Sequence, residues 1–382
     1  MAIHYSDINT AFLHVLKDVA QYGKATTTRD MNVYEVLDYS FIIDNPRHRF
    51  LVCPYRYNNI CATVAETLWV FDGRNDIGFL EFFLPRAKDF SDDGETWRGA
   101  YGPRLYGTDP GAFDDDETEH DQVENVIGTL KKDPSSRQAI IVIPDPEYDY
   151  DVNITTKDRP CTVFIQFLVR DDALHCFVRM RSNDVIWGCF NINVFEWTFL
   201  QEIIAGILGY KVGQYHHNAV SLHYYDHMDK RVLNILKYHF KEDSPPVENP
   251  HYFGVEAKPI KFDKLYKFYD TVRESINSIE LSIRDKEIHP LPASVEETLV
   301  FKDYHILLQS YVSLKLGRIT EAYYFLQRIA VNDIWVAGME LFMRTLKKTD
   351  PDAFKSYKKG IIYMMPLESP IRSLILQEWE DK

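Results

Sequence analysis

The sequence lacks the features that would place the protein in a membrane, in a disulfide-stabilised fold or along a nucleic acid. No apolar run approaches the roughly 20 residues that a membrane-spanning helix needs. The five cysteines are scattered and form no CxxC pair, which argues against a disulfide scaffold and a structural zinc site. The formal net charge of −14 disfavours a protein that coats nucleic acid, since such proteins neutralise phosphates with basic residues.

The N-terminus also lacks a secretion signal, because the opening MAIHYSDIN has no basic stretch followed by an apolar core. Unpaired cysteines suit a reducing compartment, so we expect a cytoplasmic protein with no membrane contact and no direct nucleic-acid binding. A negative net charge still allows a nucleotide substrate, because a local arginine cluster is enough to bind one phosphate.

What the chain has is enough length and apolar content for a large core, with 382 residues of which 45% are hydrophobic. Its character changes near residue 241. Glu242–Lys258 is polar and Pro-rich, which predicts a linker, and mainly helical patterns follow it. We therefore predict a catalytic domain over residues 1–245 and a helical C-terminal extension over residues 246–382. Packing, closure of a site, dimerisation and partner docking are all open roles for the extension.

Local patterns predict where the individual elements lie. The predicted helices are Ile8–Ala20, Asn59–Phe71, Val123–Lys132, Phe195–Leu208, a helix beginning at Tyr225, Phe262–Leu281, Val295–Leu316, Ile319–Thr345 and Pro366–Glu378. The predicted strands are Val33–Ile43, a short one at Phe50–Cys53, Ala139–Ile143, Cys161–Arg170, Ala173–Met180 and Lys211–Tyr225. Polar composition predicts loops at Lys24–Asp30, Asp89–Gly99 and Thr108–Glu119. Asp171-Asp172 joins two strands, which indicates a hairpin.

The stretch from Arg159 to Glu202 combines several reactive or ligand-binding side chains. Cys161 offers a nucleophile at the head of a strand. Arg181, at the end of the next strand, offers an anion binder, and Asn191 offers an amide near a helix start. The alternative for Cys161 is a small buried apolar residue, which is the usual state of a free cysteine.

The motifs, taken in chain order, resemble those of the thymidylate synthase superfamily over about residues 10 to 240. They are Arg29 after a Thr-rich turn, Glu66-x-x-Trp69 before Gly73, Tyr101-Gly-Pro-Arg-Leu-Tyr106-Gly, Asp133-Pro134-x-Ser136-Arg137, Pro160-Cys161, Gln166-Phe167, Arg181-Ser182-x-Asp184, Gly188, Phe190-Asn191 and His223-x-Tyr225. One motif alone would be a weak signal, whereas their shared order and spacing are specific. The resemblance implies an α/β fold in which helices are layered on a mixed β-sheet, and an obligate homodimer.

The resemblance also implies catalytic roles. Cys161 would add to C6 of a pyrimidine, and Glu66 would organise water and proton transfers, although a solvated helix carboxylate is its plainer interpretation. A tyrosine, Tyr106 by preference or else Tyr101, would assist removal of the C5 proton. The Cys161 thiol would need a lowered pKa, which the guanidinium of Arg181 would favour.

The co-substrate implied by the resemblance is 5,10-methylenetetrahydrofolate. Asp184 would contact its pterin ring, with Trp69 and Gly188 in the same site. No metal is expected, because the neighbouring His216 and His217 have no further ligands at metal spacing.

The nucleotide would be deoxyuridylate (dUMP). The resemblance assigns its phosphate to Arg29, Arg137, Arg181 and Ser182, with one or two arginines supplied by the other subunit. Gln138 stands where the family has a second arginine, which leaves one phosphate contact to another residue. His223 and Tyr225 would bind the 3′-hydroxyl. The Asn191 amide (Asn193 is a lesser alternative) can donate to O4 of uracil and accept from its N3–H.

Two departures from the family pattern bear on the product. Thr162 stands where a histidine usually follows the nucleophile, and a long tail follows the catalytic core. Both alter the surroundings of the methylene intermediate, which water would convert to 5-hydroxymethyl-dUMP and hydride to thymidylate. The sequence thus resembles the bacteriophage pyrimidine hydroxymethylases, which work in the host bacterial cytoplasm. A thymidylate synthase, a cytidylate hydroxymethylase and a catalytically silent nucleotide- or RNA-binding regulator are the alternatives.

Overall fold

The computed structural model describes residues 2–53, 55–106, 121–240, 260 and 262–364. The chain divides into two compact units, each built from three segments. The first contains Met1–Arg49, Ala65–Asp226 and Pro259–Ile276; the second contains Phe50–Val64, His227–Lys258 and Asn277–Lys382. The predicted boundary between residues 245 and 246 lies outside the described residues and remains a prediction. So do the predicted loop Thr108–Glu119, the linker Glu242–Lys258 and the helix Pro366–Glu378.

The first unit is organised around an eight-stranded mixed sheet. Its strands are β1 (Ile3–Tyr5), β2 (Lys24–Thr28), β3 (Met31–Ile43), β4 (Ile140–Val142), β5 (Thr162–Arg170), β6 (Ala173–Met180), β7 (Asn183–Asp184) and β8 (Lys211–Tyr225). The order is β1-β3-β8-β6-β5-β4, with β2 added to β3 and β7 added to β8. β6 runs parallel to β8 while β3 runs antiparallel to it, so the predicted mixed sheet is confirmed.

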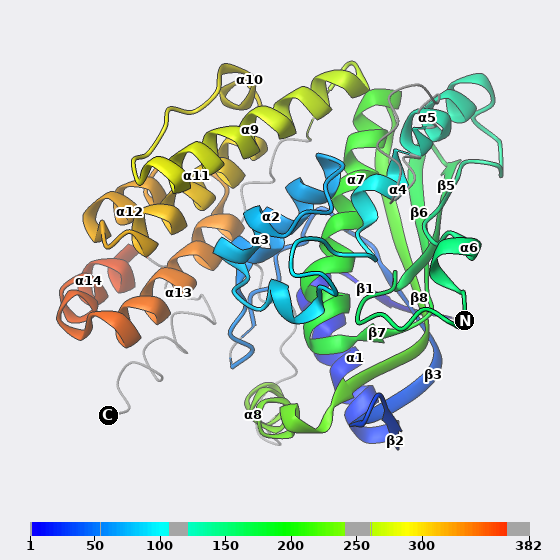
Figure 1. The fold of residues 1–382 in the computed structure, drawn as a ribbon, viewed down its shortest axis with the longest axis horizontal. Coiled ribbons are helices and arrows are strands. Elements are labelled where there is room, and N and C mark those ends of the chain that lie inside the picture. The colour runs from blue at the N-terminus through cyan, green and yellow to red at the C-terminus, as the bar shows by residue number, and fades with distance from the viewer. Residues whose placement is uncertain (1, 54, 107–120, 241–259, 261, 365–382) are drawn as a thin grey trace. The chain divides into compact units, whose positions relative to one another are not determined.

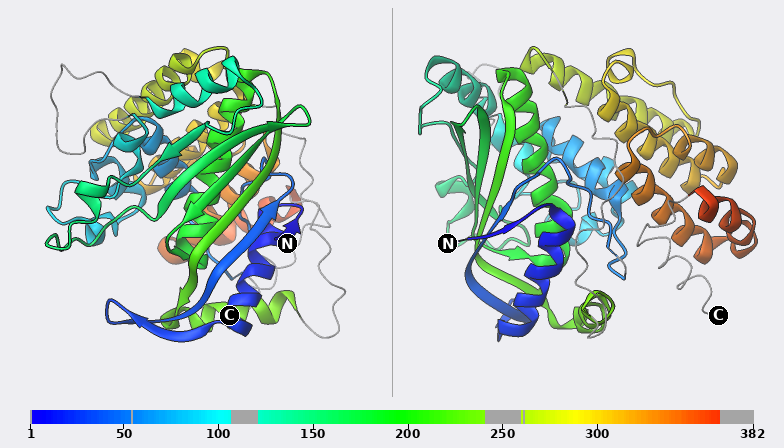
Figure 2. Two further views of the ribbon diagram at one scale, coloured as in Figure 1. Left: turned by 90° about the vertical axis from the view of Figure 1, so that its right-hand side faces the viewer. Right: turned by 180° about the vertical axis from the view of Figure 1, so that it is seen from behind.

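Helices cover one face of this sheet (Figure 1 and Figure 2). The helices of this part of the chain are α1 (Ile8–Tyr22), α2 (Ile60–Phe71), α3 (Gly78–Phe83), α4 (Tyr101–Leu105), α5 (Gln122–Lys132), α6 (Pro146–Asp149) and α7 (Val194–Leu208). α7 packs against β6 and β8. Every residue of α7 from Val194 to Ala205 is buried, because this helix is apolar on nearly all sides and forms the centre of the core.

Two turns confirm the local predictions. Asp171 and Asp172, between β5 and β6, have φ angles of 51° and 59°, the left-handed values that a tight two-residue hairpin requires. Gly209 ends α7 with φ 80°, and its N–H bonds to the carbonyl of Ala205. These turns set the direction of β6 and β8, whose ends carry several of the predicted site residues.

Two local predictions in the N-terminal part of the chain are wrong. The predicted loop at Lys24–Asp30 contains β2, since its threonines favour an extended chain and pair with β3. Arg29 and Asp30 form the turn, with φ 47° and 59°. Phe50–Cys53 forms no strand, although Phe50, Leu51 and Val52 are buried. A short apolar run indicates burial more reliably than it indicates strand pairing.

The second unit is mainly helical. Its helices are α8 (Asp229–His239), part of α9 (Leu265–Asp285), α10 (Ala293–Glu296), α11 (Leu299–Lys315), α12 (Ile319–Leu326), α13 (Asn332–Thr349) and α14 (Pro351–Met364). The single helix predicted at Ile319–Thr345 is two helices. The Asp303 carboxylate accepts hydrogen bonds from the N–H groups of Ala330 and Val331, which fixes the break between them.

The beginning of the C-terminal extension is part of the first unit. The Ile260 N–H bonds to Glu202 at 3.1 Å, and the Tyr269 hydroxyl donates to Asp121 at 2.8 Å. The Phe268 ring packs against Phe71 and Phe199, with centroids 5.6 and 6.0 Å away. None of the helices in the described part of the chain combines the length and apolar character that crossing a bilayer requires.

Candidate active site

The thiol of Cys161 and the guanidinium of Arg181 lie side by side because the β5–β6 hairpin brings its open ends together. The Arg181 N–H bonds to the Cys161 carbonyl at 2.9 Å. Its guanidinium donates to the carbonyls of Pro160 at 2.8 Å and Arg159 at 2.9 Å, and Nη2 lies 3.8 Å from Sγ of Cys161. Arg181 therefore fixes the loop that carries the nucleophile.

The electrostatics of the thiol differ from the prediction. Burial raises the pKa of the Cys161 thiol, while Arg181 and Arg29 lower it and Asp158 raises it further. The net pKa lies above the ordinary value. Arg181 thus acts in the predicted direction, but burial outweighs it, so the thiol is protonated before substrate arrives.

The amide predicted to read the base is buried and unpaired. Asn191 lies in the π-helical segment Val185–Asn193, is 1% exposed, and neither its Oδ1 nor its Nδ2 has a hydrogen-bond partner among the described residues. The alternative, Asn193, accepts a hydrogen bond from the Asn183 amide at 2.8 Å. Gly188 lies against that pair, since an added Cβ would be 3.0 Å from Nδ2 of Asn183. Buried amides are rarely left unpaired, which favours Asn191 as the ligand-binding one.

Two carboxyl groups, Glu66 and Glu196, have pKa values that burial raises. Burial, together with the Asp158 carboxylate, raises the pKa of Glu66 to about 8, and its Oε2 has no partner among the described residues. Glu196 is fully buried, and neither oxygen has a partner of good hydrogen-bond geometry among the described residues. Burial and then the charge of Glu66 raise its pKa well above the usual value, while the nearby Asn193 side chain lowers it. Both groups therefore carry protons at neutral pH. The sequence analysis missed Glu196, whose signal was a glutamate within the apolar run of Val194–Leu200.

The structure brings Tyr101, not Tyr106, to the thiol. The Tyr101 hydroxyl accepts a hydrogen bond from the N–H of Thr162 at 3.3 Å, and its pKa is raised by burial and then by Cys161. Tyr106 instead donates to the Phe71 carbonyl at 2.5 Å, and its ring meets Tyr269 edge-on, with centroids 5.0 Å apart. The position of Tyr106 therefore does not support the preference for it, because its hydroxyl is hydrogen-bonded to the Phe71 carbonyl.

Several predicted nucleotide ligands gather at the end of β8. His223 is in register with Asp184 of β7, and its ring meets Tyr225 edge-on at 5.3 Å. Burial, Asp184 and Cys161 raise the pKa of Tyr225, whereas Arg29 lowers it. Tyr225, Asp184, Cys161 and Arg29 therefore share one region, and His223 joins them through its contact with Tyr225. Ser182 follows Arg181 directly at the end of β6.

Two predicted ligands are not brought there. Arg137 is exposed, and its carbonyl accepts from the Gln166 side chain at 2.8 Å, five residues along the chain from Cys161. At about 3.3 Å per strand residue, that separation is roughly 17 Å. Trp69 is 1% exposed, and its indole N–H donates to the Asp76 carbonyl at 2.7 Å, so its role in folate binding remains a prediction that its position does not favour.

Thr162, the residue in place of the family's histidine, points into the core. It is fully buried, and its hydroxyl accepts from Trp197 at 3.2 Å and donates to the Met180 sulfur at 3.3 Å. Because both hydrogen-bonding functions are used, the hydroxyl has little capacity left to bind a reacting water.

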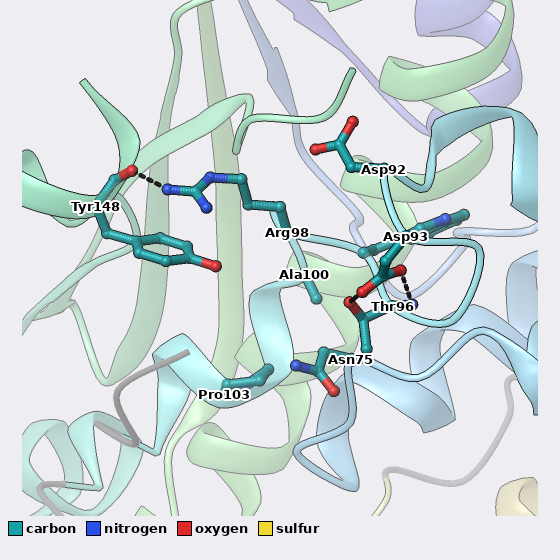
Figure 3. A pocket seen from close by; sticks show the side chains of 9 residues that line it. Asn75, Asp92, Asp93, Thr96, Arg98, Ala100, Pro103 and Tyr148 are labelled. Carbon is teal, nitrogen blue, oxygen red and sulfur yellow. Dashed lines mark hydrogen bonds between the residues drawn. The ribbon is translucent and has the colours of Figure 1, made fainter. Parts of the chain in front are cut away.

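The first unit also holds a polar pocket of about 120 Å³ (Figure 3). It is lined by Asn75, Asp92, Asp93, Thr96, Trp97, Arg98, Ala100, Pro103 and Tyr148, none of which is a predicted site residue. Arg98 lies over the Tyr148 ring, 3.5 Å from its centroid, and donates to the Tyr148 carbonyl. In the described part of the chain, no group of three or more His, Cys, Asp or Glu side chains has a metal-binding arrangement.

The chain has clear relatives among known proteins. A deoxyuridylate hydroxymethyltransferase of Delftia phage PhiW-14 is 40% identical over 206 residues, which are 52% of this chain and 54% of that relative. Another, of Bacillus phage SP01, is 30% identical over 284 residues, 73% of this chain and 74% of the relative. A thymidylate synthase of Bacillus phage phi3T is 30% identical over 202 residues, 51% of this chain and 70% of the relative.

The alignment with the Delftia phage relative therefore spans about half of that protein's length. The family model for thymidylate synthase matches residues 10–252, which include every motif on which the resemblance was based. This match covers well over half of the chain, so the protein belongs to the thymidylate synthase family.

Proposed function

We propose that the chain transfers a one-carbon unit from 5,10-methylenetetrahydrofolate to C5 of dUMP through a covalent bond between Cys161 and C6, with water capture giving 5-hydroxymethyl-dUMP. The observation that carries the proposal is the buried, unpaired Asn191 amide. It lies in the helical segment that directly follows Asp184, and Asp184 and Cys161 both act on Tyr225. The donor and acceptor of the amide complement O4 and N3–H of uracil, and an unpaired buried amide costs roughly 1–3 kcal/mol per group until a ligand satisfies it.

The reaction begins when the Cys161 thiol loses its proton and adds to C6, which makes C5 nucleophilic. Arg181, 3.8 Å from the sulfur, favours the thiolate. C5 then bonds to the methylene carbon, and loss of the C5 proton with release of tetrahydrofolate leaves a methylene group on C5. Tyr101 is the tyrosine best situated to assist this proton's removal, since its hydroxyl is bonded to the residue after the nucleophile.

In the final step a water oxygen bonds to the methylene carbon, the ring double bond re-forms between C5 and C6, and the C6–S bond breaks. Protonated Glu66 would donate a hydrogen bond toward O4 as charge develops there. The names of the Delftia and SP01 phage relatives support the water route. The phi3T relative supports the alternative, thymidylate synthesis by hydride transfer.

Mass spectrometry of the product from dUMP and methylenetetrahydrofolate tests the proposal, with dihydrofolate followed by absorbance. A hydroxymethyl product without dihydrofolate is expected. Thymidylate with stoichiometric dihydrofolate would refute the water route and leave the one-carbon transfer standing. Turnover of a cytidine nucleotide alone would refute the role of Asn191, and activity unaffected by Cys161→Ala would refute covalent catalysis.

We further propose that the active form is a homodimer in which Arg137 binds the phosphate held at the other subunit's Cys161. The exposure of Arg137 supports this arrangement, and so does its contact with Gln166, which lies five residues along the chain from Cys161. Mixing inactive Cys161→Ala and Arg137→Ala subunits should restore activity, because each mixed dimer keeps one intact site. No recovery, despite subunit exchange, would contradict shared sites.

A further inference from the structure

The proposed water route requires a general base that accepts a proton from the attacking water. Glu66 and Glu196 are poor candidates, since burial keeps both carboxyl groups protonated. Thr162 has its hydroxyl committed to Trp197 and Met180. The base must therefore be another group close to the thiol.

Asp158 is a third carboxyl group in this region, three residues before the nucleophile. Its charge acts on both Cys161 and Glu66, which places the carboxylate within electrostatic range of each. Glu66 Oε2 and both oxygens of Glu196 lack a partner among the described residues, whereas Asp158 accepts a backbone N–H, and a hydrogen bond of this kind favours the charged carboxylate.

The carboxylate of Asp158 is held in a fixed position. Oδ2 accepts the backbone N–H of Gly99 at 2.9 Å. A Cβ at residue 99 would lie 2.7 Å from this oxygen, so the glycine permits the approach. The Thr156 hydroxyl donates to the Asp158 carbonyl at 3.0 Å, and Arg181 holds the carbonyls of the next two residues. The segment from Asp158 to the thiol is thus fixed at both ends.

No cation within 4 Å pairs with this carboxylate in the described part of the chain. Arg104, whose charge lowers the pKa of Asp158, makes a bidentate ion pair with Asp149. Arg181 is occupied by backbone carbonyls. Burial raises the pKa of Asp158, which makes its carboxylate a stronger base than a solvated aspartate.

We propose that Asp158 is a catalytic residue of the water-capture step, accepting the proton of the water that attacks the methylene carbon. The O–C bond forms as the water O–H bond breaks toward Asp158. The electron pair of the exocyclic double bond moves to C5=C6, and the C6–S pair leaves as the Cys161 thiolate. Asp158 then returns the proton to solvent. This inference rests on the proposed function, and it assigns Asp158 to the last step alone.

The test separates the last step from the earlier ones with the full-length Asp158→Asn variant, whose amide oxygen can still accept from Gly99. Tritium release from dUMP labelled at C5 reports every step up to the methylene intermediate, and mass spectrometry reports 5-hydroxymethyl-dUMP. In a single turnover, tritium release should stay within about 3-fold of the wild type, while hydroxymethyl product should fall about 10²-fold or more. The stalled adduct should appear in the intact-protein mass, and an added small thiol should capture the methylene group.

Asp92→Asn is the matched control. Asp92 is exposed and accepts from the Lys157 N–H at 3.0 Å on the same loop, so its loss of charge should leave the product unchanged. If Asp158→Asn does not fold, Asp158→Glu must show the same separation with a smaller loss. Equal loss of tritium release and product, or no loss of product, overturns the role of Asp158. Thymidylate from the wild type overturns the proposed function itself, independently of the variant.

Discussion

The position of Tyr101 gives the sharpest prediction, which concerns Tyr101→Phe and its matched partner Tyr106→Phe. Each change removes one hydroxyl and keeps the ring. Tyr101→Phe leaves the Thr162 N–H without its acceptor, and since that hydrogen bond is long at 3.3 Å, we expect a loss of only about 1 kcal/mol in stability. Tyr106→Phe removes the bond to the Phe71 carbonyl and should cost a similar amount.

The two variants should differ strongly in catalysis. Removing a proton-transfer group typically lowers a rate by about 10²–10⁴-fold, so release of the C5 tritium should fall by that factor in Tyr101→Phe. In Tyr106→Phe it should stay within about 3-fold, because that hydroxyl is bonded to the core and not to the nucleophile's loop. Pre-steady-state tritium release from labelled dUMP measures this step directly.

Thermal denaturation of both variants provides the control, since equal and small losses of stability exclude unfolding as the cause. The reasoning about Tyr101 would be refuted if Tyr106→Phe abolished tritium release while Tyr101→Phe retained it. That result would favour the original preference for Tyr106 and would require Tyr106 to leave its bond to Phe71 when substrate binds.

Three further predictions concern stability, pH and specificity. Arg104→Leu should destabilise the protein by about 3–5 kcal/mol in urea unfolding, because it leaves the Asp149 carboxylate buried and unpaired; a loss below about 1 kcal/mol would contradict this. The pKa of Glu66 is raised from its ordinary value of 4.5 to about 8. Between these two pH values the folded state keeps a proton that the unfolded state has lost. The free energy of unfolding of the wild type should therefore fall as pH rises from about 4.5 to about 8. Glu66→Gln should therefore gain stability relative to the wild type between about pH 5 and pH 9, and a pH-independent difference would argue against the raised pKa. Asn191→Asp should shift kcat/KM from dUMP toward dCMP by about 10²-fold, measured with both nucleotides in competition, and an unchanged ratio would exclude Asn191 from base recognition.

Much of the fold follows from local sequence. The β5–β6 hairpin, α7 with its terminal Gly209, and β8 over Lys211–Tyr225 were predicted because alternation, helical spacing and turn residues act within a few positions. The errors have a shared cause. Phe50–Cys53 has a strand's composition without a strand's partner, and a long helical pattern such as Ile319–Thr345 does not reveal that Asp303 caps a break within it.

For the candidate site, too, the sequence supplied some of the information and the tertiary structure the rest. The sequence alone supplied the thiol, the arginine, the amide and their order, which were sufficient to recognise the family. It preferred Tyr106 over Tyr101, although both lie within one short motif and the motif alone does not show which hydroxyl approaches the nucleophile's loop. It gave no reason to consider Asp158, whose contact with Gly99 joins residues far apart in the chain. Glu196 was overlooked because its unpaired state depends on the side chains that surround it.

The sequence by itself therefore determined which chemical groups the protein has and which local elements carry them, because helix and strand periods, turns and motifs are properties of neighbouring residues. Only the tertiary structure decided which tyrosine meets the Cys161 loop, and that burial outweighs Arg181 in setting the pKa of the thiol. Both depend on distances between distant segments and on the depth of the surrounding core, which the order of residues alone does not specify.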